Sequence, residues 1–357
     1  MPAFTIPGVT VPAWTPQFHI SERARDIYVW DRSGSKEPLQ VAHFAGAYDA
    51  PDIVFTELGD TIVAGNSFCV RSETLGVIRE SLTLINGASW ARLIPPGEKL
   101  VQVDNDEPVL VVGNLASRNY YHWTLQCFAS FLVFRRLKGD DDFAAIMPGL
   151  NSFQAQLVST ADFYGRLFEI EKDEVISAHK GVYANLCGGA FAFAPHPAVM
   201  HEFDALAARA ECERTFSRRI YVSRKDADMK RGITNEAAVC DLMERHGFEI
   251  ITPGELTIEE QMVAFRDAEI VAGPHGAGLT NLVYCSRGAR VLELVQMSYF
   301  PGFYVRICQA KGLDYIGIIN PDVIARDEAD QPVHQRNFNN VSSEIDIALL
   351  ESVLSEL

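Results

Sequence analysis

The sequence of 357 residues has seven cysteines, but no two of them form a CxxC pair. Their odd number and wide spacing predict neither a disulfide framework nor a zinc site, and favour a reducing compartment. The opening stretch MPAFTIPGVTVPAW has three prolines and no basic segment, so no signal peptide is predicted. The densest apolar run, Phe128–Phe134, is too short for a membrane helix. We therefore expect a cytoplasmic chain without an integral membrane segment.

Basic residues are scarce in this chain: 31 stand against 47 acidic residues, for a net charge of −16. This balance argues against nucleic acid or an anionic membrane as the default partner, and general solubility explains the acidity. Hydrophobic residues make up 48% of the chain and charged residues 22%, which is enough apolar content for real cores. The length suits two domains of ordinary size, and a homo-oligomer is left open.

Two enzyme classes are disfavoured by missing motifs. No G-x-S-x-G nucleophile elbow occurs, so an α/β-hydrolase is not predicted. The glycine spacing of Gly273, Gly276 and Gly278 is G-x-x-G-x-G rather than G-x-G-x-x-G, which argues against a nicotinamide dehydrogenase.

What the chain does have is a glycine-rich turn between apolar segments. The pattern around it predicts a strand over 269–272, the turn itself, the opening of a helix over 279–285 and a strand over 291–295. Such a turn directs backbone N–H groups and a helix dipole at one place, which suits a phosphate, and His275 adds a further donor. A turn that only packs a helix on a strand is the alternative, and spacing alone leaves both open.

Strands and helices alternate from residue 218 onward. We expect strands over 220–223, 248–252, 270–273 and 315–319, and helices over 235–246, 257–268 and 303–311. This alternation predicts a parallel sheet, which binds ligands at the carboxyl ends of its strands. Arg224 and Arg231 follow the first of these strands, and His275 follows the third. We therefore predict that they converge on one anion, the alternative being solvated loop charge.

The N-terminal half predicts short strands up to residue 118, followed by the segment Asn119-Tyr-Tyr-His122-Trp123 and a helix over 124–137. His122 lies in the predicted connection between a strand and a helix, and it can serve as a general base. For Trp123 a place in the core is favoured. A long helix over 198–216 connects the halves. We expect an acceptor-side domain at 1–212, a Rossmann-like domain at 213–335, and a C-terminal tail and helix at 336–357.

Several segments together resemble glycosyltransferase family 61. They are Arg219-Ile-Tyr-Val-Ser-Arg224, Arg231-Gly-Ile-Thr-Asn235-Glu236, Glu260-Gln261 and Gly273-Pro-His275-Gly276-Ala277-Gly278-Leu-Thr-Asn281, preceded by the NYYHW segment. The resemblance runs continuously through the C-terminal half and is confined to that one segment in the N-terminal half. Eukaryotic members carry a secretory or anchoring segment that is not visible here, so we expect the bacterial branch, which includes capsular polysaccharide enzymes.

The resemblance implies an α/β fold of GT-B type, with two Rossmann-like domains facing across a cleft. It also implies an inverting transfer of a sugar from a nucleotide-sugar donor, UDP-linked by expectation, to a glycan acceptor such as a capsular polysaccharide. No cofactor is expected. The predicted donor-binding residues are Arg224, Arg231, Asn235, His275, Gly276, Ala277, Gly278, Asn281 and Glu293, with Glu293 placed on the ribose by analogy with other Rossmann sites. On the acceptor side we expect Asn119 and Trp123.

An inverting transfer needs a base for the acceptor hydroxyl. His122 is the first candidate and Asp226 the second. A non-catalytic nucleotide- or sugar-binding protein of the same fold is the alternative to an enzyme.

Two D-x-D tripeptides, Asp104-Asn-Asp106 and Asp226-Ala-Asp228, match a pattern with which some glycosyltransferases hold a divalent ion. In so acidic a chain this tripeptide is common. A GT-B site uses basic groups and helix dipoles in place of a metal. Both segments are therefore expected to be loop carboxylates, and no essential metal is predicted.

Overall fold

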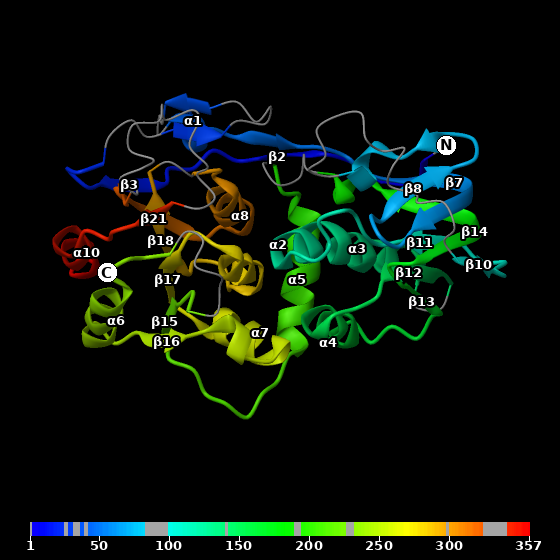
Figure 1. Cartoon of the computed structure of the whole chain (residues 1–357). Coiled ribbons are helices and arrows are strands. Elements are labelled where there is room, and N and C mark those ends of the chain that lie inside the picture. The colour runs from blue at the N-terminus through cyan, green and yellow to red at the C-terminus, as the bar shows by residue number, and fades with distance from the viewer. Residues whose placement is uncertain are drawn as a thin grey trace. The chain divides into compact units, whose positions relative to one another are not determined.

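The computed structural model describes most of the chain, with the gaps shown in grey in Figure 1. The described residues are 2–24, 28–30, 36–38, 42–82, 99–139, 142–188, 194–225, 232–297, 300–323 and 341–357. Within these ranges no helix is both long and apolar enough to cross a membrane.

The chain divides into two compact units. The first consists of Met1–Thr10 and Asp49–Leu206, and the second of Val11–Tyr48 and Ala207–Leu357. This division differs from the expected one at both ends of the chain. Residues 11–48 join the second unit because strand β3 (Gln17–Ile20) pairs with a strand of its sheet. The C-terminal tail also belongs to that unit and is not a separate segment.

The second unit is built on a six-stranded parallel sheet of order β16-β15-β17-β18-β19-β3. The bounds are Arg219–Val222 for β15, Glu249–Ile251 for β16, Ile270–Pro274 for β17, Arg290–Gln296 for β18 and Asp314–Asn320 for β19. All of β17 and all but the first residue of β18 are buried. Continuous burial is typical of parallel strands that are covered on both faces. The parallel sheet predicted from the alternating pattern is confirmed.

Helices cover both faces of this sheet (Figure 1). On one face lie α6 (Glu236–Arg245) and α10 (Ile347–Leu354), whose Leu242 and Leu350 pack in one core with strand residues such as Leu292. On the other lie α7 (Ile258–Asp267) and α8 (Phe303–Lys311). Thr257 and Glu260 form a capping box that starts α7. Gly312, with a φ of 70°, ends α8 in the left-handed conformation. The predicted helices are thus confirmed to within a residue or two.

The segment after the glycine turn differs in kind from the expected helix. Ala277–Tyr284 forms the 3-10 helix η7 rather than an α-helix. Its side chains from Leu279 to Tyr284 are all buried. An apolar pattern of this length does not tell the tighter 3-10 winding from an α-helical one.

The first unit contains a nine-stranded mixed sheet. Its central strand is β14 (Glu174–Ala184). β14 runs parallel to β10 (Lys99–Val103) and β11 (Val109–Val111), and antiparallel to the long strand β7 (Ile53–Ala64). The remaining strands are β1 (Pro2–Ile6), β8 (Cys69–Ser72), β9 (Gly76–Val77), β12 (Ala144–Pro148) and β13 (Leu167–Ile170). The sheet is therefore parallel only in part: β13, β12, β11 and β14 are parallel neighbours, whereas β7 is antiparallel to β14.

One nearly continuous helical segment begins within the NYYHW motif. It consists of α2 (Tyr120–His122), a π-helical turn η3 (Trp123–Phe128) and α3 (Ala129–Lys138). The helix expected over 124–137 is present, but its first turns are π-helical. Such turns occur frequently at functional sites. Two further helices are α4 (Ser152–Thr160) and α5 (Pro197–Arg209), the latter shorter than the connector predicted to residue 216.

The shorter elements complete the described fold. They are β2 (Val9–Val11), β4 (Tyr28–Trp30), β5 (Lys36–Pro38), α1 (Ala42–Ala45), β6 (Tyr48–Ala50), η1 (Arg79–Leu82), η4 (Asn185–Cys187), η6 (Pro253–Glu255), β20 (Asp322–Val323) and β21 (Ser342–Ser343).

Candidate functional site at the carboxyl edge of the parallel sheet

Arg224 lies at the carboxyl edge of the second unit's sheet, two residues after β15 ends. Its guanidinium group donates a hydrogen bond to the backbone oxygen of His275, which directly follows β17. The two strands are parallel neighbours, so their ends meet at this edge. Arg224 therefore lies against the glycine turn, whereas its binding of an anion there stays a prediction.

Gly276 gives Arg224 the space that it occupies. A methyl group at Gly276 would lie 2.8 Å from Cζ and 3.1 Å from Cδ of Arg224, and would collide with Nη1. The φ of Gly276 is 174°, an extended conformation open to any residue, so the close approach and not the backbone requires glycine. The other two glycines serve packing. A Cβ at Gly273 or at Gly278 would lie 3.0 Å from atoms of Val222 on β15.

The start of η7 offers backbone donors beside Arg224. The first N–H with a helical partner is that of Leu279, which donates to the oxygen of Gly276 at 3.0 Å. The N–H groups of Ala277 and Gly278 precede it and have no partner within the helix, as is usual for a helix start. Both residues are half-buried. Tyr304 of α8 holds the turn, since its hydroxyl donates to the Gly276 oxygen at 2.6 Å.

Beneath the turn, His275 is held by a buried carboxylate. Its Nδ1 lies 2.5 Å from Oε1 of Glu293, and the hydroxyl of Tyr315 donates to Oε2 at 2.6 Å. Burial, together with the charge of Glu293, raises the pKa of Tyr315 well above its ordinary value. Tyr315 thus stays protonated and remains a donor. Glu293 itself is 0% exposed.

This burial argues against the ribose contact expected of Glu293. Both carboxylate oxygens already have partners, and no face of the residue is open to a ligand. The structure instead makes Glu293 a positioning residue that fixes the ring orientation of His275. A strand-end glutamate looks the same in sequence whether it faces outward or inward, so the pattern could not separate the two roles.

Two asparagines predicted to bind donor have structural partners. Asn235 precedes α6, but its side chain does not cap the helix. It exchanges two hydrogen bonds with the backbone of Ile345, at 2.8 and 2.9 Å. Asn281 is fully buried and donates to Gln261 of α7 at 2.7 Å. Both contacts link segments of the second unit.

Glu236 is a site residue whose role the sequence did not reveal. Its Oε1 accepts a hydrogen bond from the Ser223 hydroxyl at 2.8 Å and one from the backbone N–H of Arg224 at 3.4 Å. These bonds hold the loop from which Arg224 projects. Glu236 belongs to the segment Arg231-Gly-Ile-Thr-Asn235-Glu236 that resembles the family, but the spacing does not show which residues Glu236 contacts. Arg231, Asp226 and Asp228 lie outside the described residues.

In the first unit, the NYYHW segment forms a capped helix start. The side chain of Asn119 accepts hydrogen bonds from the backbone N–H groups of Tyr121 at 2.9 Å and His122 at 3.4 Å. His122 is half-buried, and its Nδ1 lies 3.1 Å from Oε1 of Gln126. Burial lowers the pKa of His122 below its ordinary 6.5, and the hydrogen bond to Gln126 opposes this shift. The imidazole is therefore neutral, and able to accept a proton, over a wider pH range.

Trp123 is 0% exposed, which agrees with the core position favoured for it and leaves no surface for an acceptor. The first D-x-D segment also has a local structural role. Asn105 bonds to the backbone of His179, while the backbone oxygens of Asp104 and Asp106 accept from Arg166 and Lys180. Across the described ranges, no group of three or more His, Cys, Asp or Glu residues is arranged to hold a metal ion.

Comparison with known proteins identifies the family. Residues 120–292 match the model of Glycosyltransferase 61. Over 71 residues the chain is 37% identical to the beta-1,2-xylosyltransferase RCN11 of Oryza sativa subsp. japonica, a match that covers 20% of this chain and 13% of that protein. Over 60 residues it is 30% identical to a beta-1,2-xylosyltransferase of Arabidopsis thaliana, covering 17% of this chain and 11% of the relative. The matches thus span about an eighth of the relatives' length. Residues 120–292 of this chain thus match glycosyltransferase family 61, the family that the sequence motifs resemble.

Proposed function

We propose that this protein is an inverting glycosyltransferase that moves a sugar from a nucleotide-sugar donor to a glycan acceptor. The observation that carries the proposal is the Arg224 guanidinium seated on Gly276, next to the N–H groups of Ala277 and Gly278. A cation and backbone donors at the carboxyl edge of a parallel sheet suit the diphosphate of a nucleotide. The family of residues 120–292 supports the same reading.

The chemistry requires charge stabilisation and a base. As the bond between the anomeric carbon and the diphosphate breaks, negative charge grows on the phosphate oxygens. Arg224 and the turn N–H groups oppose that charge, and they are fixed in place before the reaction. The acceptor hydroxyl attacks the anomeric carbon and gives up its proton, for which His122 is the proposed base. Its lowered pKa keeps it unprotonated at neutral pH.

We propose a donor with a pentose or hexose on UDP. The curated relatives are xylosyltransferases by name, so UDP-xylose is the first donor to test. Three further points stay predictions. The acceptor is a surface or capsular polysaccharide, the location is cytoplasmic, and the two units face each other as in GT-B enzymes. Independence from metal stays a prediction as well.

The test is a panel of nucleotide sugars offered with and without glycan acceptors, with released nucleoside diphosphate as the readout. The proposal predicts release from at least one donor that depends on an acceptor. A donor that binds saturably but is never consumed with any acceptor would favour the alternative, a non-catalytic sugar- or nucleotide-binding protein.

A further inference from the structure

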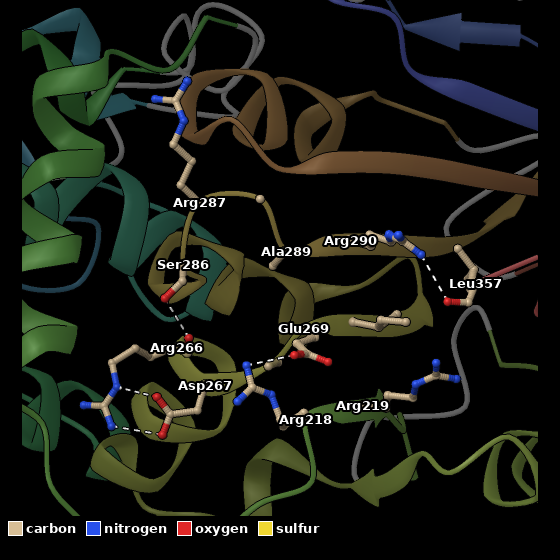
Figure 2. Close-up of a pocket in the computed structure, with 13 residues that line it drawn as sticks. Arg218, Arg219, Arg266, Asp267, Glu269, Ser286, Arg287, Ala289, Arg290 and Leu357 are labelled. Atoms are coloured by element: carbon tan, nitrogen blue, oxygen red, sulfur yellow. Dashed lines mark hydrogen bonds and ion pairs between the residues drawn. The ribbon is translucent and has the colours of Figure 1, made fainter.

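A cavity lies at the amino edge of the second unit's sheet, opposite the candidate donor site (Figure 2). It has a volume of about 660 Å³, within the usual range for small-molecule sites. Residues at or just before the starts of β15, β17 and β18 line it, including Arg218, Arg219, Glu269 and Arg290. Since ligands of parallel sheets bind at the carboxyl edge, the proposed donor site does not account for this cavity.

The lining carries five arginines and two acidic side chains. The two acids are already paired: Arg218 lies 2.9 Å from Glu269, and Arg266 lies 2.8 Å from Asp267. Figure 2 shows both pairs. Two guanidinium groups remain, those of Arg219 and Arg287, and no carboxylate of the described residues forms an ion pair with either of them. Arg290 is not counted with them, because it donates to a main-chain oxygen of Leu357, the last residue of the sequence. One cavity therefore collects an excess of two positive charges in a chain whose net charge is −16.

Further contacts hold Arg219, Arg290 and Arg287 in place. Arg219 donates to the backbone oxygen of His246 at 3.2 Å and lies over the ring of Phe248. Arg290 donates to the backbone oxygen of Leu357 at 3.1 Å. Arg287 packs against Gly312, where an added Cβ would lie 3.2 Å from its guanidinium carbon. A guanidinium group has five N–H donors, so each of these bonds leaves most of them available.

We infer that this amino-edge cavity binds a compact polyanion that carries phosphoryl or carboxylate groups. Like charges held around one cavity repel each other, and an anion that bridges them removes the repulsion. Arginine is suited to this role because its planar fork matches both phosphate and carboxylate oxygens. The site is separate from Arg224, which lies at the other end of β15.

The inference is tested by calorimetric titration of the full chain with inorganic pyrophosphate and, separately, with citrate, at constant ionic strength. Pyrophosphate probes the phosphoryl source and citrate the carboxylate source. We expect saturable binding of at least one of them. The double variant Arg219→Gln/Arg287→Gln should raise its dissociation constant at least tenfold. The matched control is Arg23→Gln, which removes one arginine charge from the same unit. Arg23 is half exposed and paired with Glu344, and its replacement should change the dissociation constant less than twofold.

Pyrophosphate can also bind at the donor site, so the titrations are repeated with Arg224→Gln. If the amino-edge cavity is a separate site, Arg224→Gln should leave the anion affinity of that cavity unchanged. The same variant should weaken the binding of nucleoside diphosphate at the donor site. If the double variant fails to fold, Arg287→Gln alone replaces it, because Arg287 packs on Gly312 and its side chain forms no hydrogen bond with any of the described residues. Absence of saturable binding by both anions would overturn the inference, as would binding that only Arg224→Gln removes. Neither result bears on donor turnover, so the two proposals fail separately.

Discussion

At the scale of single residues, the candidate site depends on Gly276, because the missing side chain leaves space that another residue occupies. Gly276 leaves room for the guanidinium of Arg224, whereas Gly278, two residues later, leaves room for Val222 and Pro253. Identical letters in the sequence thus have different roles. The sequence predicted that the turn matters but could not divide phosphate binding from packing among its glycines, because the neighbours come from residues about 50 positions earlier.

Gly276→Ala should lower donor turnover at least tenfold, which corresponds to a loss of about 1.4 kcal/mol or more of transition-state stabilisation. The variant should lose little folding stability. The new methyl group displaces the end of a flexible side chain, which can move aside, but Arg224 then leaves the turn. Gly278→Ala is the matched control. Its methyl group would lie 3.0 Å from Cγ1 of Val222 and 3.3 Å from Cγ of Pro253, so it should reduce stability more than turnover. Equal turnover losses in the two variants would refute this assignment.

If His122 is the base, its pKa should set the acid limb of the pH–rate profile. Burial lowers its folded pKa below 6.5, so the neutral base persists at lower pH and the limb should fall below pH 6.5. His122→Asn should lower turnover by about 10²- to 10⁴-fold and remove the limb. The control is His201→Asn, an exposed histidine of the same unit. Near wild-type turnover and an unchanged limb in His122→Asn would exclude the base role.

The same shift has a consequence for stability. Since the folded pKa of His122 is depressed, the unfolded chain takes up the proton first as the pH falls below 6.5. The contribution of this group to folding is therefore lost on acidification.

At the scale of elements, strands and α-helices of the second unit follow closely from the sequence, because their apolar periods and caps are local. Thr257 and Glu260 stand three residues apart and start α7 as predicted. The features that the sequence did not predict depend on distant partners. Asn235 bonds to Ile345, and β3 pairs with β19 across almost the whole length of the chain. Likewise, the π-helical turn after His122 has no distinct apolar period.

The helix start at Asp346 provides an element-scale prediction. Asp346 caps α10, accepting from the backbone N–H of Leu349 at 3.2 Å, and Ser21 donates to it at 2.8 Å. The hydrogen bond from Ser21 is the main reason why its pKa is lowered from 3.8. A depressed carboxyl pKa stabilises the fold above the unfolded value, and this stabilisation is lost as the pH falls through the folded pKa.

Asp346→Ala should therefore cost about 1 kcal/mol of unfolding free energy at pH 7. The loss should be smaller at pH 3, because below pH 3.8 the unfolded chain takes up the proton first and the stabilisation from the lowered pKa shrinks. Asp346→Asn is the control, since it retains a capping side chain without the charge. Urea unfolding at both pH values measures these differences. A cost for Asp346→Ala that does not change with pH would show that the charge adds nothing to the cap.

At the scale of the whole molecule, the chain combines a net charge of −16 with five arginines around one cavity at the amino edge of the second unit's sheet and Arg224 at its carboxyl edge. Composition gave the first property and disfavoured nucleic acid as a partner, but it could not locate the second. Arg218, Arg219, Arg287 and Arg290 are scattered in sequence, and only the parallel order of β15, β17 and β18 brings them to one cavity. The division into units was also beyond the sequence, since residues 11–48 join the second unit through a non-local strand pair.

The position of Arg224 at the donor edge leads to a prediction about metals. Transfer should persist in excess EDTA, with less than a twofold change in turnover. Arg224 and the turn N–H groups would supply the charge stabilisation that a divalent ion supplies elsewhere. Complete loss of transfer, restored by manganese or magnesium, would contradict this and return attention to the D-x-D segments.

The central claim is that Arg224 at the glycine turn stabilises the donor's departing diphosphate. It is tested most directly by the turnover of Arg224→Ala with saturating donor and acceptor, next to circular dichroism of the same sample. We predict a folded protein whose turnover has fallen by about 10²- to 10³-fold or more, because a preorganised donor of positive charge has been removed from the transition state. Wild-type turnover in a properly folded Arg224→Ala protein would contradict the account.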